Sequence, residues 1–552
     1  MGPVQNTDPF ALDVCLGDAP RGRHHGGPGR ALRQVDALGA GPLSRDEAIV
    51  IGAGPNGLTA GALLAREGFS VTILEAQSEV GGSARSEEFH PGYWTGGLLH
   101  DTSGLRPAVI DELELEKHGL ELGGPPDMFV PTVDGRGLLV AHDAQQAIAE
   151  IQQHSAGDAE RYVEFRAFFD RVRGFAARVL DGMPPDVLAD PSAGELLGPA
   201  WALRRLGRKD MMEVLRLGPM CAADWLNEWF EGELLKCALA QPALLGTFMG
   251  PWSPGSNTNL LRHEALTGRA AQRGPHAVVA ALVAAATSQG ARIRTAAKVM
   301  RIKVHHGAVT GVVLADGEEL DATTVVATCH PVSTFLRLVD GAGRPPGIER
   351  ALRAFRSKGC TAKVHLALDT PLRFACRPDL PITHARLGER MDDLERAFDV
   401  AKYGGFSTQP ILDVHVASER DPSLAPAGHA AVSMLVSYAP YDLEGGWTDD
   451  RRQALGDAAV AVLGRHAPGV KSHIVARQIL TPVDLEAIYG LPGGHLYHGD
   501  HALDQLIVRP APGSGRFRTP VDGLWLGGSG SHPGGGITGG PGRLAARAVG
   551  SA

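Results

Sequence analysis

The sequence has no surplus of basic residues, few cysteines and no long apolar run. Lys and Arg number 53 against 62 Asp and Glu, whereas a nucleic-acid-binding chain usually carries a basic surplus. Six cysteines are scattered without a Cys-x-x-Cys pair, which argues against a metal knuckle or a redox-active disulfide. No apolar run is long enough to span a membrane as a helix. We therefore expect no nucleic-acid partner, no metal site and reduced thiols in a cytoplasmic protein.

The remaining composition is that of a globular chain, with 43% hydrophobic and 21% charged residues. A chain of 552 residues exceeds a single core, so about two or three domains are expected. Residues 1–46 differ from the rest because they are rich in Gly, Arg and Pro without periodicity. We expect this segment to be a disordered leader. It lacks the charged segment and apolar core of a signal peptide, so none is predicted.

Ordered structure is predicted to begin with a strand, a helix and a second strand. Glu47–Ile51 is a short apolar run, residues 58–69 have helical spacing, and residues 70–76 form another apolar run. A unit of this size is typical of dinucleotide binding when glycines connect its first two elements. The connection here is Gly52-x-Gly54-x-x-Gly57.

Each position of this connection has a physical role in binding a dinucleotide. Gly52 permits the tight turn, Gly54 allows the backbone to approach a pyrophosphate, and Gly57 allows the helix to pack closely on the strand. The helix that begins around Pro55 and Asn56 presents backbone N–H groups and a partial positive charge to phosphates. These residues are therefore predicted to bind the cofactor.

The residues that follow the second strand favour FAD over a nicotinamide cofactor. Glu75 ends that strand, where its carboxylate can accept hydrogen bonds from ribose hydroxyls and disfavours a 2′-phosphate. A second glycine pair, Gly81-Gly82, follows at once and is often present where the chain returns past the pyrophosphate of FAD. Arg85 is placed near the flavin or pyrophosphate, with a surface arginine as the alternative.

Two quoted segments carry a resemblance to a known family. Residues 49–86, "IVIGAGPNGLTAGALLAREGFSVTILEAQSEVGGSARS", resemble the N-terminal signature of the phytoene desaturase-like flavoproteins. Residues 495–549, which end in "GLWLGGSGSHPGGGITGGPGRLAARAV", are similar to the C-terminus of the pyridine nucleotide-disulfide oxidoreductase domain-containing branch of that family. Both belong to the wider amine oxidase and glutathione reductase-type FAD fold.

The resemblance implies why eight of the sixteen residues from 528 to 543 are glycine. In the family this segment runs beside the flavin, and the helix after it directs its N-terminus at the ring, where N–H groups stabilise negative charge. The strand around Val299 matches the family strand that usually touches the FAD adenine through backbone groups. The implied cofactor residues of these parts are Val299, Gly528, Ser529, Gly535, Gly536, Ile537 and Thr538.

We predict an α/β fold: a Rossmann-like FAD-binding domain of the glutathione reductase/amine oxidase type with a mixed α+β substrate domain. Residues 47–125, 264–335 and 500–552 are assigned to the FAD-binding domain, and residues 126–263 and 336–499 to the substrate domain. Residues 150–261 have mainly helical spacing, whereas 361–368 and 430–438 are predicted strands. Asp316-Gly317 is predicted to be a tight turn.

Three histidines are candidate catalytic groups. His532 lies within the flavin-proximal segment, His498 lies in a stretch that matches a family segment near the active-site cavity, and His263 matches a family histidine. A structural histidine is the alternative for each of them. His495, His498 and His501 are spaced three apart, but their segment is predicted to be a loop, and a metal is not predicted there.

The predicted function is that of an FAD-dependent oxidoreductase that desaturates an apolar or polyene-like substrate, such as a carotenoid, a retinoid or a secondary metabolite. Oxygen or a quinone would be the electron acceptor. An amine-oxidase-type enzyme, a redox-neutral isomerase and a non-catalytic FAD-binding interaction protein are the alternatives. Residues 199–220 are basic with apolar residues between them, which favours a solvated helix, with peripheral membrane contact as the alternative.

Overall fold

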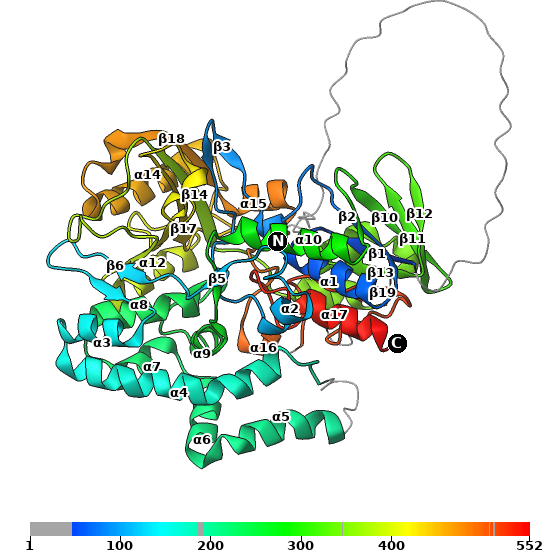
Figure 1. The fold of residues 1–552 in the computed structure, drawn as a ribbon, viewed down its shortest axis with the longest axis horizontal. Coiled ribbons are helices and arrows are strands. Elements are labelled where there is room, and N and C mark those ends of the chain that lie inside the picture. The colour runs from blue at the N-terminus through cyan, green and yellow to red at the C-terminus, as the bar shows by residue number, and fades with distance from the viewer. Residues whose placement is uncertain (1–46, 186–192, 345, 507, 512–513) are drawn as a thin grey trace, which may run out of the picture. The chain divides into compact units, whose positions relative to one another are not determined.

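A computed structural model describes residues 47–185, 193–344, 346–506, 508–511 and 514–552 of the chain. A parallel five-stranded sheet has the order β19-β13-β1-β2-β9. Its strands are β1 (Glu47–Ile51), β2 (Ser70–Leu74), β9 (Arg292–Arg294), β13 (Thr324–Ala327) and β19 (Leu524–Leu526). Strands from near the start, the middle and the end of the described chain therefore share one sheet (Figure 1).

The central strand of this sheet is apolar because both of its faces are covered. Four of the five residues of β1 are buried, as expected for a parallel strand between two layers. One layer contains α1 (Pro55–Arg66), α10 (Pro275–Ser288) and α17 (Gly540–Gly550). The other layer includes an antiparallel three-stranded sheet of β10 (Val299–His305), β11 (Ala308–Leu314) and β12 (Glu319–Asp321).

A second large sheet has seven strands in the order β18-β14-β17-β16-β15-β6-β7. Neighbouring strands are antiparallel except for β15 and β6. Every residue of β14, which lies between β18 and β17, is buried. The strands are β6 (Met128–Val130), β7 (Leu138–Val140), β14 (Thr361–Leu368), β15 (His384–Leu387), β16 (Leu412–Val416), β17 (Ala430–Ser437) and β18 (Ile474–Leu480).

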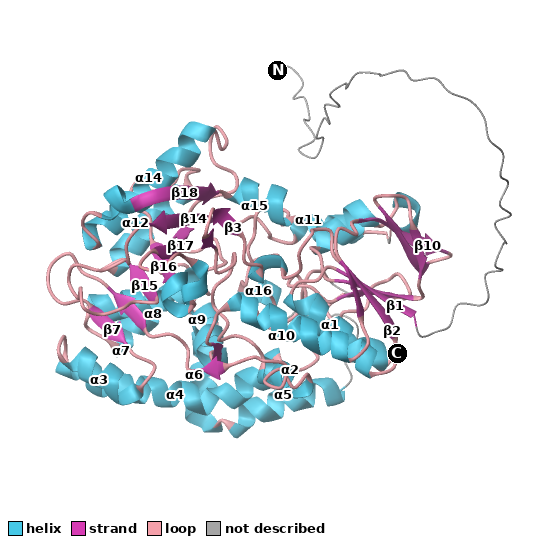
Figure 2. Ribbon diagram, turned by 45° about the horizontal axis from the view of Figure 1, so that its top comes forward, coloured by secondary structure: helices cyan, strands magenta, loops and turns pink. Residues whose placement is uncertain are grey.

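Helices surround this sheet, as Figure 2 shows in cyan. One aromatic-rich core joins several of them, with Phe165, Phe169 and Trp225 in edge-to-face or tilted contact. Its helices are α3 (Ala144–Gln152), α4 (Ala156–Leu180), α7 (Ala222–Trp229), α8 (Glu233–Leu244), α9 (Asn257–Leu266) and α12 (Met391–Lys402). Helix α14 (Asp449–His466) packs on the seven-stranded sheet.

The remaining elements are short or peripheral. The helices are α2 (Pro107–Glu112), α5 (Ala193–Arg205), α6 (Gly207–Leu217), α11 (Ile348–Ala354), α13 (Ala417–Arg420), α15 (Pro482–Tyr489) and α16 (Leu503–Leu506). Two small ribbons pair β3 (Glu88–His90) with β4 (Tyr93–Trp94), and β5 (Leu122–Gly123) with β8 (Ala270–Ala271). In the described part of the chain, no helix is both long and apolar enough to cross a membrane.

The predicted elements agree with the structure where local sequence specifies them. The strands expected at 361–368 and 430–438 are confirmed as β14 and β17, and Asp316-Gly317 forms the turn between β11 and β12. The five- and three-stranded sheets use residues assigned to the FAD-binding domain, and the seven-stranded sheet uses residues assigned to the substrate domain. The division into two domains stays a prediction. The leader predicted at 1–46 lies outside the described residues.

A substitution at Gly57 tests the close packing of α1 against the end of β1. A Cβ atom there would lie 1.8 Å from the carbonyl oxygen of Gly52. We expect Gly57→Ala to lower the free energy of unfolding of the apoprotein by about 1–3 kcal/mol, because backbone must move. The control is Gly174→Ala within α4, where nothing lies within 4 Å of an added Cβ. It should raise stability by about 0.5–1 kcal/mol. Thermal unfolding of both variants measures the contrast, and equal melting temperatures would contradict it.

Candidate active site

The turn after β1 and the start of α1 contain five predicted cofactor residues: Gly52, Gly54, Pro55, Asn56 and Gly57. Gly52 has φ +99°, and α1 begins at Pro55 without a side-chain cap on its first N–H groups. Oδ1 of Asn56 is buried and has no hydrogen-bond partner among the described residues. This helix end therefore offers uncapped donors and an unsatisfied amide to a ligand.

The predicted acidic residue and the second glycine pair lie against the same turn. Oε2 of Glu75 accepts a hydrogen bond of 2.8 Å from the backbone N–H of Ala53. A Cβ atom at Gly82 would lie 3.2 Å from the Cα of Gly54, so the two glycines face each other closely. The chain leading to Val299 on β10 is also close, because the N–H of Ala297 donates to the carbonyl of Glu75.

Arg85 is held by neighbours rather than left free. Its Nε donates to Oε1 of Glu87 over 2.8 Å, and its guanidinium carbon lies 5.6 Å from the centre of the Tyr489 ring. The predicted contact of Arg85 with the flavin or pyrophosphate stays untested.

The C-terminal glycine segment returns to this turn. Nδ2 of Asn56 donates to Oγ of Ser529 over 3.2 Å, and a Cβ atom at Gly528 would lie 2.2 Å from the carbonyl oxygen of Thr328 after β13. Helix α17 follows with Gly539 as its N-cap at φ +66°, again without a side-chain cap. Two helix N-termini, those of α1 and α17, thus lack side-chain caps next to one another (Figure 1).

A cavity of about 420 Å³ begins at this glycine segment. Four predicted cofactor residues line it: Gly535, Gly536, Ile537 and Thr538. Most of the remaining wall comes from α4, α8, α9, the loop at residues 99–106 and one face of the seven-stranded sheet, and Tyr497 and His501 also contribute. The cavity therefore connects the glycine segment with the sheet that was assigned to the substrate domain.

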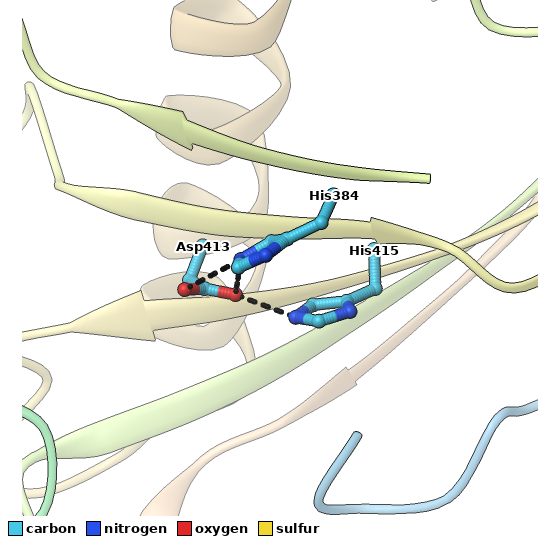
Figure 3. A group of neighbouring side chains, drawn as sticks. All are labelled: His384, Asp413 and His415. Carbon is cyan, nitrogen blue, oxygen red and sulfur yellow. Dashed lines mark hydrogen bonds and ion pairs between the residues drawn. The ribbon is translucent and has the colours of Figure 1, made fainter. Parts of the chain in front are cut away.

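One wall of the cavity carries a hydrogen-bonded cluster on β15 and β16 (Figure 3). The antiparallel register pairs His384 with His415 and Arg386 with Asp413. Nε2 of His415 lies 2.8 Å from Asp413 Oδ1, and Nε2 of His384 lies 3.1 Å from both carboxylate oxygens. Nε of Arg386 donates to Oδ2 over 3.3 Å. Cross-strand pairing thus gathers three nitrogen-bearing side chains around one carboxylate.

Two members of the cluster, Asp413 and His415, have shifted pKa values. Burial raises the pKa of Asp413, but His384 and His415 outweigh it and hold this pKa well below its usual range. Burial lowers the pKa of His415 to about 4, although Asp413 opposes the shift. Asp413 is therefore anionic and His415 neutral. Among the described residues, His384, Asp413 and His415 form the one group of three side chains whose potential metal-ligand atoms all lie within 4.8 Å of one another. This spacing is compatible with a bound metal ion. The oxygens of Asp413 already accept from three side chains.

Comparison with known proteins identifies the family. The model of flavin containing amine oxidoreductases matches residues 202–539, and that of the NAD(P)-binding Rossmann-like domain matches residues 50–105. The chain is 35% identical to rat pyridine nucleotide-disulfide oxidoreductase domain-containing protein 2, over 95% of this chain and 97% of the relative. The chain belongs to the flavin containing amine oxidoreductase family. It is an FAD-dependent oxidoreductase, as the two quoted segments predicted.

More distant relatives of this oxidoreductase include two bacterial proteins. A limonene dehydrogenase subunit of Castellaniella defragrans is 27% identical over 91% of this chain and 94% of its own. A 4,4'-diapophytoene desaturase of a Methylomonas species is 26% identical over 89% and 92%. The fold is also that of an oxidoreductase from Methanosarcina mazei (TM-score 0.58, 15% identity, 91% and 99% covered) and of cyclohexylamine oxidase from Brevibacterium oxydans (TM-score 0.55, 17% identity, 92% and 99% covered).

The residues around the glycine turns fit FAD. The N-termini of α1 and α17, which lack side-chain caps, and the close approach of Gly54 and Gly82 suit the phosphates of FAD, whereas the unsatisfied Oδ1 of Asn56 is an acceptor and suits a hydroxyl or N–H donor. At the start of α17 the backbone N–H of Gly540 donates to Oγ1 of Thr538 over 3.2 Å. The assignment of individual residues to FAD stays a prediction.

The three candidate histidines occupy different environments. His263 on α9 lines the cavity; burial lowers its pKa, against Glu264 and Asp101, so it is neutral near pH 7. His498 lies outside the cavity lining, has φ +57° and is within 5.4 Å of the His330 ring. Its imidazole pKa falls to about 3, first through burial.

His532, the first choice from the sequence, does not line the cavity. Its Nδ1 lies 3.3 Å from the carbonyl oxygen of Leu506, and its Nε2 lies 3.2 Å from that of Val179. Both ring nitrogens therefore face backbone carbonyls, and neither is free for a substrate. This geometry favours a structural histidine, although its sequence neighbours Gly535 to Thr538 do line the cavity. A catalytic role for any of the three histidines stays untested.

Five aromatic side chains do not line the cavity: Tyr93, Trp94, Phe248, Trp252 and Phe517. Phe517 is fully buried in a core cluster, and the hydroxyl of Tyr93 is hydrogen-bonded to His429. Trp94, Phe248 and Trp252 are each 37–40% exposed.

Two further predictions from the sequence concern the helical layer and the loops. The basic segment at 199–220 forms α5 and α6, where Trp201, Met212 and Leu215 are each more than half exposed. Membrane contact by these helices stays a prediction. In the described chain His495, His498 and His501 do not form a group with metal-ligand spacing.

The functional candidates that the sequence did not indicate come from separated segments. Arg262, Tyr497 and His501 surround Gly535, and Asp413 lies on the far sheet. No local motif marks any of them, although the family resemblance covers the YHGDH stretch at 497–501.

A substitution at Gly54 tests the predicted FAD site without disturbing the folding of the apoprotein. A Cβ atom there would meet only the Cα of Gly82, at 3.8 Å, which is an ordinary contact. Gly54→Ala should therefore leave the melting temperature of the apoprotein close to that of the wild type but weaken FAD binding at least about tenfold, or ~1.4 kcal/mol. Fluorescence titration of apoprotein with FAD measures this loss. Wild-type affinity in the variant would place the pyrophosphate elsewhere, and Gly174→Ala serves as the control.

The environment of His532 predicts a pH effect on stability. Burial lowers the pKa of this imidazole from 6.5 to about 4. Between pH 6.5 and pH 4 the imidazole is protonated in the unfolded chain but neutral in the folded chain. The free energy of unfolding is therefore highest above pH 6.5 and decreases as the pH falls toward 4. Between pH 7.5 and pH 5 this loss is about 2 kcal/mol. His532→Gln should lose less stability over that range in urea unfolding of the apoprotein. An unchanged pH profile would contradict the assignment.

Proposed function

We propose that this oxidoreductase dehydrogenates adjacent carbon atoms of a substrate with an extended apolar part, forming a carbon–carbon double bond. The observation that carries the proposal is the cavity, which starts at Gly535–Thr538 and continues between α8, α9 and the seven-stranded sheet. Its apolar lining includes Leu99, Leu239, Leu245, Leu266, Ile411 and Leu435. The names of two bacterial relatives, a limonene dehydrogenase subunit and a diapophytoene desaturase, support the same class of reaction.

The chain's own residues bind and orient the substrate. When bound, FAD supplies the acceptor for two electrons and a proton equivalent. Apolar side chains from α8 and α9 exclude water around the substrate, and the uncapped start of α17 favours negative charge at the glycine segment. His263 is one of the neutral imidazoles that line the cavity and is the one we propose as the proton acceptor. Oxygen or a quinone is the proposed final electron acceptor.

Anaerobic reduction of the purified holoenzyme tests this function. Limonene and 4,4'-diapophytoene, in detergent, are compared with cyclohexylamine and benzylamine while the flavin absorbance near 450 nm is followed. Bleaching by a hydrocarbon and not by either amine supports dehydrogenation at carbon. Bleaching by amines alone supports an amine oxidase, and double-bond migration in the product without bleaching supports an isomerase. Either of these results would overturn the proposal.

The position of the cavity predicts the effect of filling it. Leu266 lies on α9 and lines the cavity, whereas Leu503 on α16 is 48% exposed and lies outside it. Leu266→Trp should keep FAD but slow reduction by the bleaching substrate at least about tenfold, because the larger side chain overpacks the site. Leu503→Trp should behave like the wild type in stopped-flow reduction. Equal rates for both variants would show that the substrate binds elsewhere.

A further inference from the structure

Arg262 stands out among the cationic side chains of the cavity because it lacks an acidic partner among the described residues. It lies on α9, and its Nη2 donates to the carbonyl oxygen of Gly535 over 3.1 Å. Its Nε is buried and has no hydrogen-bond partner in the same part of the chain. Among the described residues, the neutral carbonyl of Gly535 is thus the one clear hydrogen-bond acceptor for this guanidinium. The contact lies at the end of the cavity nearest the glycine segment.

The other arginines that line the cavity are paired with carboxylates. Arg106 binds Asp181 through two hydrogen bonds of 2.6 and 2.8 Å. Arg166 binds Glu264, and Arg386 binds Asp413. Burial lowers the pKa of Arg262 to about 10, with Tyr497 acting in the opposite direction, so the guanidinium remains charged near pH 7. An enclosed cation without a counter-ion is costly unless a ligand supplies the charge.

His501 adds a second hydrogen-bond donor beside Arg262. The backbone N–H of Gly535 donates to Nε2 of His501 over 3.1 Å, so Nε2 is the accepting nitrogen. Burial and Arg262 hold the pKa of this imidazole well below its usual range, so the ring is neutral and its proton is on Nδ1. That Nδ1–H then faces Nη1 of Arg262 at 3.4 Å. Two donors meet here without an acceptor between them.

We propose that Arg262 and the Nδ1–H of His501 bind a carboxylate group of the substrate at the Gly535 end of the cavity. An anionic oxygen between the two donors would accept from both and neutralise the guanidinium. One uncompensated cation matches one monoanion, and the planar guanidinium matches a planar carboxylate better than a phosphate dianion. This inference rests on the proposed function, because it assigns a polar end to the same substrate. The substrate class is an unsaturated or saturated carboxylic acid with an apolar chain.

Isothermal titration calorimetry of the holoenzyme with sorbate, a conjugated dienoate, and with its neutral analogue sorbamide tests the site without turnover. The wild type should bind sorbate at least about tenfold more tightly, because hydrogen bonds to charged groups exceed neutral ones. Arg262→Met should reduce this preference to less than about twofold. Arg262→Lys keeps the positive charge but not the two parallel N–H donors of the guanidinium, so it should keep part of the preference for sorbate.

A double variant provides the matched control. Arg166→Met with Glu264→Gln removes a cavity-lining arginine together with its acidic partner and should keep the preference for sorbate. Equal binding of sorbate and sorbamide by the wild type would overturn the proposal, as would an unchanged preference in Arg262→Met. Loss of FAD absorbance from both Arg262 variants would also overturn it, since the arginine would then serve the cofactor. If sorbate is preferred but the flavin is bleached neither by a hydrocarbon nor by a saturated carboxylic acid with an apolar chain, the dehydrogenase function fails while the carboxylate site stands.

Discussion

The arrangement of this oxidoreductase depends on the close approach of two glycine-containing turns from opposite ends of the described chain. Within the first turn, a Cβ atom at Gly57 would lie 1.8 Å from the carbonyl oxygen of Gly52. Between the two turns, a Cβ atom at Gly542 would lie 2.0 Å from the carbonyl oxygen of Asn56. The contact of Gly542 with Asn56 holds the N-termini of α1 and α17 together, and neither helix has a side-chain cap. Two partial positive charges side by side are unfavourable alone. An anionic cofactor bound at this place would offset them, and the packing of the two turns would then also form its site.

The elements near these turns were predictable because their signals are local. The spacing of Gly52, Gly54 and Gly57 specifies a turn between a strand and a helix whatever the rest of the chain does. The strands β14 and β17 were also predictable, since continuous apolar runs of eight residues indicate buried strands. The family resemblance added FAD and the position of the C-terminal segment, which composition alone did not provide.

The cavity was not predictable in the same way, because its residues meet only through tertiary structure. His384 and His415 face Asp413 because of the register between β15 and β16, and no sequence spacing shows that register. His532 was chosen for its nearness in sequence to Gly535, yet its ring turns toward the carbonyls of Val179 and Leu506. Nearness along the chain fixes where a backbone lies but not which way a side chain points.

The distribution of charge along the cavity constrains how a substrate would lie in it. The sheet end holds Asp413 with its three partners, a group whose charges are already compensated. The glycine end holds Arg262, whose charge is not compensated by any described residue. Apolar side chains of α8 and α9 line the space between them. A carboxylate bound at Arg262 would then place the adjacent carbons, and not the distant apolar end, beside Gly535. Dehydrogenation near the carboxylate follows from that orientation, because the hydrogen to be removed must come from the carbons held closest to the glycine segment.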